Sequence, residues 1–228
     1  MRPIVQEQLA GKQLPLIMAH KGGTAYGREN SLKAIKGALA IMPDVIIEID
    51  VRKSSDGVLY CHHGSVPFGV SVAAFFGIFS FAKIQRLIGQ RDTLAEILAA
   101  IPETTVVYLD IKDRTITAQD LKKVIGNRKN LWIAPLTTLK HLKELREGLG
   151  EGYPYAYNRP VLFPRRMARR LGTHADFLQS FWWNWSQNLI EEIEGSGVVY
   201  HMCEWFISRE KYIASLGRSR YHGLFFSI

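Results

Sequence analysis

Residues 44–51 read Asp-Val-Ile-Ile-Glu-Ile-Asp-Val, a pattern that predicts a buried β-strand carrying two acids. Strand side chains alternate between faces, so Glu48 and Asp50 project from one face beside buried Ile47 and Ile49. Repulsion between two such carboxylates is relieved by a hard divalent ion, for which carboxylate oxygens are the preferred ligands. The alternative is a half-exposed strand with two solvated acids.

A β-hairpin is predicted directly after this strand. Asp56-Gly57 separates it from a second apolar run, Val-Leu-Tyr-Cys-His at 58–62, and Asp-Gly between such runs is typical of a tight turn. A two-residue loop places His62 opposite Val51, whereas a three-residue loop places it opposite Asp50. Either register brings an imidazole near the acid pair, but only the second puts it on the same face.

A second histidine ends an earlier apolar run. Residues 14–20 read Leu-Pro-Leu-Ile-Met-Ala-His, and the run stops in Lys21-Gly22-Gly23, where glycines let the backbone turn and leave room for a ligand. A lone histidine at a strand end is commonly a polar cap. Two histidines that flank an acid pair favour a catalytic site instead.

The ordered set of motifs resembles the glycerophosphodiester phosphodiesterase family. The matching pieces are His20-Lys21-Gly22, Glu29-Asn30, Glu48-Ile49-Asp50, Asp56-Gly57, His62 and Leu109-Asp110-Ile111-Lys112. Each motif alone is weak evidence for the family, but their order along the chain is specific to it.

This resemblance implies a role for each matching residue. His20 and His62 would be the general acid and base. Glu48, Asp50 and Asp110 would hold a divalent cation, Mg²⁺ or Ca²⁺. Lys112 would contact the substrate phosphate with Lys21 adding positive charge, and Glu29 would orient the first histidine or the substrate.

The sequence departs from the family pattern at several positions. Lys21 replaces the usual Arg and loses its bidentate fork. His63 stands where the family commonly has Asp, and Asp110 is one methylene shorter than the usual Glu. Residues 223–228 resemble the family's last strand but lack its closing Thr-Asp-Pro.

Alternating strand and helix patterns predict a (β/α)8 TIM barrel, an α/β fold, as one domain over residues 1–228. Nine strands are predicted near 14–20, 45–52, 58–62, 105–111, 131–136, 153–158, 176–181, 198–203 and 223–227. Helices are predicted near 29–42, 92–100, 117–126, 137–149, 160–171, 185–195 and 208–216. If 58–62 is the antiparallel hairpin strand, the other eight form the barrel, and its site lies at their carboxyl ends.

Two aromatic segments are candidates for substrate contact. The apolar insertion at 70–82, near the expected barrel mouth, is either a lid for a lipid-like group or ordinary packing of a connecting helix. Trp183, in the run Phe-Trp-Trp-Asn-Trp at 181–185, is expected to line the substrate pocket, although core packing explains some of these rings.

Composition limits the classes of binding partner that are expected. The net charge of +8 favours anionic ligands, but no nucleic-acid-binding motif accompanies the basic run at 165–170, so nucleic acid is not expected. Two cysteines and an N-terminus without a signal-peptide pattern predict a cytoplasmic protein. The expected partner is a small phosphodiester, with peripheral membrane contact possible and no obligate protein partner.

Three functions remain open. The first is metal-dependent hydrolysis of glycerophosphodiesters to glycerol 3-phosphate and an alcohol. The second is phospholipase-D-like or phosphatidylinositol-specific lyase activity on membrane phospholipids, favoured by the apolar insertion and basic charge. The third is a barrel that binds a phosphodiester without turnover, favoured by His63 and the missing terminal acid.

Overall fold

The computed structural model describes residues 2–12, 16–64, 77–136, 138–161, 164–171, 174–181, 186–195, 197–203 and 223–226. Its strands are β1 (Leu16–Ala19), β2 (Ile46–Lys53), β3 (Leu59–Cys61), β4 (Val107–Ile111), β5 (Leu131–Pro135), β6 (Ala156–Val161), β7 (Phe177–Phe181), β8 (Val199–Cys203) and β9 (Gly223–Phe226). All nine predicted strands are therefore present, each close to its predicted position.

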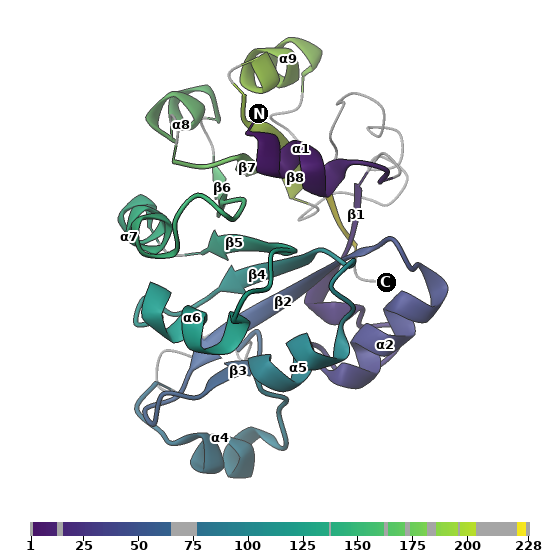
Figure 1. Cartoon of the computed structure of the whole chain (residues 1–228), viewed down its shortest axis with the longest axis vertical. Coiled ribbons are helices and arrows are strands. Elements are labelled where there is room, and N and C mark those ends of the chain that lie inside the picture. Colours follow the sequence, from purple (N-terminus) through teal and green to yellow (C-terminus); the bar gives the residue numbers. More distant parts are fainter. Residues whose placement is uncertain are drawn as a thin grey trace.

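Helices surround these strands (Figure 1). They are α1 (Pro3–Leu9), α2 (Leu32–Ile41), α4 (Phe81–Ile88), α5 (Leu94–Ala100), α6 (Ala118–Ile125), α7 (Leu139–Leu149), α8 (Pro164–Leu171), α9 (Gln187–Gly195) and the short 3-10 helix η1 (His20–Gly22). The predicted helix near 208–216 lies outside the described residues. None of the helices in the described ranges is long and apolar enough to cross a lipid bilayer.

The sheet follows the order β5-β4-β2-β1-β9-β8-β7-β6, and all the neighbours along it are parallel. Its two ends meet through an isolated parallel bridge between Ile133 and Tyr155, where the Ile133 amide donates to the Pro154 carbonyl at 2.9 Å. The fold is the predicted (β/α)8 barrel, with β3 attached to β2 outside the barrel path.

The hairpin adopts the second of the two registers that the sequence allowed. Val51 pairs with Cys61, and the His62 amide donates to the Asp50 carbonyl at 3.1 Å. The turn contains three residues, 55–57, because Ser54 still pairs with Val58. Gly57 has a φ of 83°, a conformation that glycine adopts without strain. His62 is therefore on the same face of the hairpin as Asp50.

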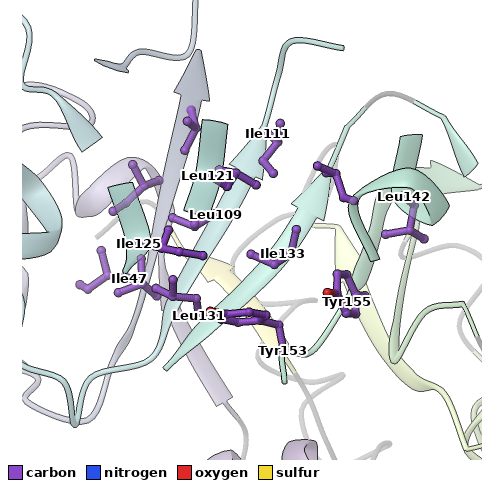
Figure 2. Packing of buried hydrophobic residues seen from close by; sticks show 14 of the residues in the cluster. Ile47, Leu109, Ile111, Leu121, Ile125, Leu131, Ile133, Leu142, Tyr153 and Tyr155 are labelled. Atoms are coloured by element: carbon purple, nitrogen blue, oxygen red, sulfur yellow. The ribbon is translucent and has the colours of Figure 1, made fainter. Parts of the chain in front are cut away.

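Two hydrophobic cores lie on opposite faces of the strands. The outer core packs the sheet against the helices and contains Ile47, Leu109, Ile133, Leu121 and Leu142 (Figure 2). The inner core fills the barrel and contains Met18, Ile46, Val106, Tyr108, Trp132, Ala134, Ala156 and Phe177. Residues at even positions of β2, β4 and β5 face inward, and those at odd positions face the helices.

Helix α1, which was not predicted from the sequence, packs against the inner core. Val5 and Leu9 are buried in that core. Arg2 at the start of the helix donates to both Asp176 carboxylate oxygens, at 2.7 and 2.6 Å. These contacts join segments far apart in sequence, so local pattern gives little sign of them.

The described part of the apolar insertion, residues 77–82, leads into α4, which begins at Phe81. Its Ile84 packs against Tyr60 of β3, and the rings of Phe81 and Tyr60 are 5.6 Å apart. Tyr60 is two residues from His62, so α4 covers the hairpin face that carries this histidine. Residues 65–76 lie outside the described residues.

Candidate active site

Three buried carboxylates meet inside the carboxyl end of the barrel. Glu48 and Asp50 come from β2, and Asp110 of β4 is directly paired with Asp50 in the ladder. One carboxylate oxygen from each lies within 4.8 Å of the others, and none of the three residues is more than 5% exposed. The strand alternation that the sequence predicted is thus the cause of this cluster.

The cluster carries more negative charge than its surroundings neutralise. Burial, followed by the charge of Asp50, raises the pKa of Glu48 to about 8. Burial also raises the pKa of Asp110 to about 6, against the opposing effect of Lys112. Asp110 Oδ1 is buried without a hydrogen-bond partner among the described residues. Oxygen ligands, unbalanced charge and an unpaired oxygen together fit a hard divalent cation.

Asp50 is the most strongly held of the three acids. Its Oδ2 accepts from Asn30 Nδ2 at 2.7 Å, and its Oδ1 lies 2.8 Å from Lys112 Nζ. Burial opposes its ionisation, but Lys112 and the hydrogen bonds outweigh burial and lower its pKa to about 2. Lys112 Nζ also lies 2.5 Å from Asp110 Oδ2. Lys112, predicted to contact phosphate, thus bridges two of the acids.

His62 lies at the edge of this cluster and is 6% exposed. Its Nδ1 is 3.5 Å from Glu29 Oε1, and Lys21 Nζ is 3.4 Å from Glu29 Oε2. Hydrogen bonding to His62 is the largest cause that lowers the pKa of Glu29 to about 2. Glu29 thus contacts the second histidine, whereas the family resemblance implied that it orients the first histidine or the substrate.

His20 and Lys21 follow β1 in the turn η1. His20 is near enough to Glu48 and Asp110 for its charge to lower the pKa of each. Lys21 has a φ of 52°, in the left-handed region, and its amide donates to Glu48 Oε2 at 2.5 Å. A non-glycine residue in that conformation is costly, and such strain concentrates at functional sites.

Two residues of the site were not assigned to it from the sequence. Asn30, which the sequence offered only as part of the Glu29-Asn30 motif, binds both the carboxylate and the amide of Asp50, while Ser31 caps α2. Arg52 continues the inward face of Glu48 and Asp50 and donates to the carbonyls of His62 and His63. Arg52 could have been found from the sequence, because it continues the alternation of Glu48 and Asp50 along β2.

The remaining predicted positions are less fully described. His63 is half-buried, and burial lowers its pKa to about 4, so it is neutral at pH 7. Trp183, predicted to contact substrate, lies outside the described residues, as does the end of the chain after Phe226.

Enzymes with a (β/α)8 barrel have their active sites at the carboxyl ends of the strands, which is where the acids and histidines of this chain lie. A model of the glycerophosphoryl diester phosphodiesterase family matches residues 20–158, and the chain belongs to this family. It is a phosphoric diester hydrolase. No curated protein matches the sequence.

Solved structures share the fold. A glycerophosphodiester phosphodiesterase from Thermotoga maritima has a TM-score of 0.73 at 19% identity, covering 94% of this chain and 96% of that one. One from Parabacteroides distasonis has a TM-score of 0.73 at 16% identity, covering 94% of each chain. An Oleispira antarctica phosphodiesterase, solved with the product sn-glycerol-3-phosphate, has a TM-score of 0.73 at 18% identity, covering 93% of this chain and 92% of that one.

Proposed function

We propose that the chain hydrolyses glycerophosphodiesters to glycerol 3-phosphate and an alcohol, using His20 and His62 as general acid and base. The observation that carries this proposal is the cluster of Glu48, Asp50 and Asp110 within 4.8 Å, with His62 opposite Asp50 in the hairpin. A single domain over 1–228 and a small-molecule substrate complete the proposal. The solved product complex of the Oleispira antarctica protein supports the choice of product.

Glu48, Asp50 and Asp110 are the residues that would hold a divalent cation, either Mg²⁺ or Ca²⁺. A bound ion supplies positive charge that neutralises a non-bridging phosphate oxygen and the charge that develops in the transition state. The raised pKa of Glu48 and the unpaired oxygen of Asp110 support this assignment, since both reflect negative charge that the protein leaves unbalanced.

Two lysines are placed to bind the phosphate beside the acids. Lys112 is 7% exposed in its side chain and touches Asp50 and Asp110, so a phosphate oxygen near this pair meets a fixed positive charge. Lys21 is held by the backbone of the η1 turn and by Glu29. Such preorganised charges favour the transition state because they need no rearrangement when charge develops.

The two histidines divide the proton transfers. A carboxylate beside Nδ1 of His62 favours a proton on that nitrogen, which leaves Nε2 to exchange a proton with the substrate. One histidine removes a proton from the attacking hydroxyl, and the other protonates the leaving alcohol. Each transfer typically contributes about 10²–10⁴-fold in rate.

The test is to incubate the pure protein with glycerophosphocholine and glycerophosphoethanolamine plus Mg²⁺ or Ca²⁺, and to follow products by phosphorus NMR. We expect glycerol 3-phosphate, and a loss of about 10²–10⁴-fold in kcat in His20→Ala and in His62→Ala, with normal folding by circular dichroism. A cyclic phosphate product, or turnover only on phospholipid vesicles, would show the lyase or phospholipase activity instead. Binding without any product would show a non-catalytic barrel.

Metal dependence is tested separately by chelation. We expect EDTA to stop turnover and added Mg²⁺ or Ca²⁺ to restore it, because chelation would remove the positive charge that the three carboxylates would hold beside the phosphate. Asp110→Asn is the matched variant, since it keeps the side-chain shape but removes one charged ligand, and it should need more ion for half-maximal rate. Full activity in a metal-free preparation would contradict the role of the acids.

A further inference from the structure

Arg52 is a buried charged residue at the edge of the site, with 7% exposure. Its Nη1 donates to Asp113 Oδ1 at 2.7 Å, and its Nε and Nη2 donate to two backbone carbonyls, those of His62 at 3.1 Å and His63 at 2.8 Å. Buried arginines are retained where directed hydrogen bonds satisfy the guanidinium. Two of these three bonds converge on the segment that carries His62.

This segment lies where the hairpin ladder ends. The last backbone bond between the two strands runs from the His62 amide to the Asp50 carbonyl. The carbonyls of His62 and His63 are then held by the Arg52 side chain. The position of the His62 backbone therefore depends on a side chain that leaves the same face of β2 as Asp50.

Asp113, which lies just after β4, accepts a hydrogen bond from the Arg52 guanidinium and fixes its position. Its Oδ2 accepts from the Lys53 amide at 2.9 Å, while Oδ1 holds Arg52. Asp113 follows Lys112, whose amide donates to the Val51 carbonyl at 3.0 Å. Arg52 and Asp113 thus tie the ends of β2, β3 and β4 together around the acid cluster.

We propose that Arg52, held by Asp113, is a positioning residue that sets the backbone at His62-His63 and so aims the His62 imidazole at the reacting phosphate. The inference rests on the proposed catalytic role of His62. A lysine cannot replace Arg52, because its ammonium is a point charge on a flexible stem and lacks the planar fork that reaches both carbonyls and the carboxylate.

The experiment compares Arg52→Lys with a matched control, Arg128→Lys. Arg128 also donates to backbone carbonyls, those of Leu98, Ile101 and Pro102, but it lies in the loop before β5, at the amino ends of the strands. Both variants make the same chemical change and should lower Tm by similar amounts. We expect only Arg52→Lys to lower kcat, by about 10²-fold, with little change in KM, because a small misplacement of a catalytic group costs about that much.

Two further measurements complete the test. Calorimetry should show that Arg52→Lys binds Mg²⁺ or Ca²⁺ like the parent, since the three acids are unchanged, and Asp113→Asn should lower kcat in the same direction by a smaller factor. An unchanged kcat in Arg52→Lys, or an equal loss in Arg128→Lys, would overturn the inference. If His62→Ala itself retains full turnover, the proposed function fails, whatever the arginine variants show.

Discussion

The inner face of the barrel has two regions of opposite chemistry only two residues apart. The barrel floor, defined here as Met18, Ile46, Tyr108, Trp132 and Phe177, is apolar and fully packed. The acidic rim, defined as Glu48, Asp50 and Asp110, follows it at the next inward positions of β2 and β4. The same strand alternation produces both regions, so what separates them is one step of two residues toward the carboxyl ends.

The difference shows how the barrel separates stability from function. The floor gains free energy by removing large side chains from water, and its rings stack closely, with Trp132 and Phe177 centroids 4.3 Å apart. The rim costs free energy, because burial raises the pKa of Glu48 and Asp110 and leaves an oxygen unpaired. Changes to the floor should therefore alter stability, and changes to the rim should alter ion binding.

The largest expected effect is at the floor. Trp132 is fully buried, stacks on Phe177 and meets Tyr108 at 6.2 Å between ring centroids. We expect Trp132→Ala to lower the free energy of unfolding by about 3–5 kcal/mol, because it leaves a large cavity. Urea denaturation measures this loss, with Trp132→Phe as a control that keeps most of the ring. Equal stability of the alanine variant and the parent would show that the floor does not support the barrel.

The second-largest expected effect is on the stability that a bound ion gives through the acidic rim. A divalent ion that binds only the folded protein stabilises it by about 2.7 kcal/mol at 100 times its dissociation constant. We expect this gain for the parent at pH 8, measured by urea denaturation with and without Mg²⁺ or Ca²⁺. Asp110→Asn should lose most of the gain, whereas the same variant without ion should be at least as stable as the parent.

The pH dependence of stability in the absence of a bound ion shows whether ionising the buried acids of the rim destabilises the folded protein. The pKa of Glu48 is about 8 in the folded protein, above its ordinary value of 4.5, so between these values the folded chain keeps a proton that the unfolded chain has lost. Stability in EDTA should therefore fall as pH rises through this window. Glu48→Gln should remove most of the fall between pH 7 and 8, where Asp110, with a pKa of about 6, has largely lost its proton. A rise in stability over that range in the parent would contradict the assignment.

Features set by local pattern were predicted from the sequence, and features set by distant contacts were not. The strand at 45–52 and its two inward acids follow from apolar alternation, and the structure has β2 at Ile46–Lys53. The role of Asn30 has no such local signal, because Ser31 supplies the cap of α2. Asn30 instead binds Asp50, twenty positions away, a contact that exists only because β1 and β2 are neighbours.

Dependence on distant contacts also explains why α1, the contact of Glu29 and the hairpin register were not predicted. Helix α1 has a short, mixed sequence, and its position depends on Arg2 reaching Asp176 at the far end of the chain. The contact between Glu29 and His62 was not predicted either, because the hairpin register brings His62 to it, whereas the family resemblance implied that Glu29 orients His20 or the substrate. The register itself was left open because two-residue and three-residue turns both suit Asp-Gly, and only the pairing of Ser54 with Val58 decides between them.

The smallest expected effect tests whether the η1 turn beside the acidic rim stores backbone strain. Lys21 has a φ of 52°, where an L-residue costs about 1–2 kcal/mol and glycine does not, although glycine loses part of the difference to its greater freedom in the unfolded chain. We expect Lys21→Gly to raise the free energy of unfolding by about 0.5–1 kcal/mol while it lowers turnover, because the phosphate loses a positive charge. Lys21→Ala is the matched control, since it loses the same charge but keeps the strained backbone, and it should lower turnover without the gain in stability. If both variants are equally stable, the left-handed conformation of Lys21 costs the folded protein nothing.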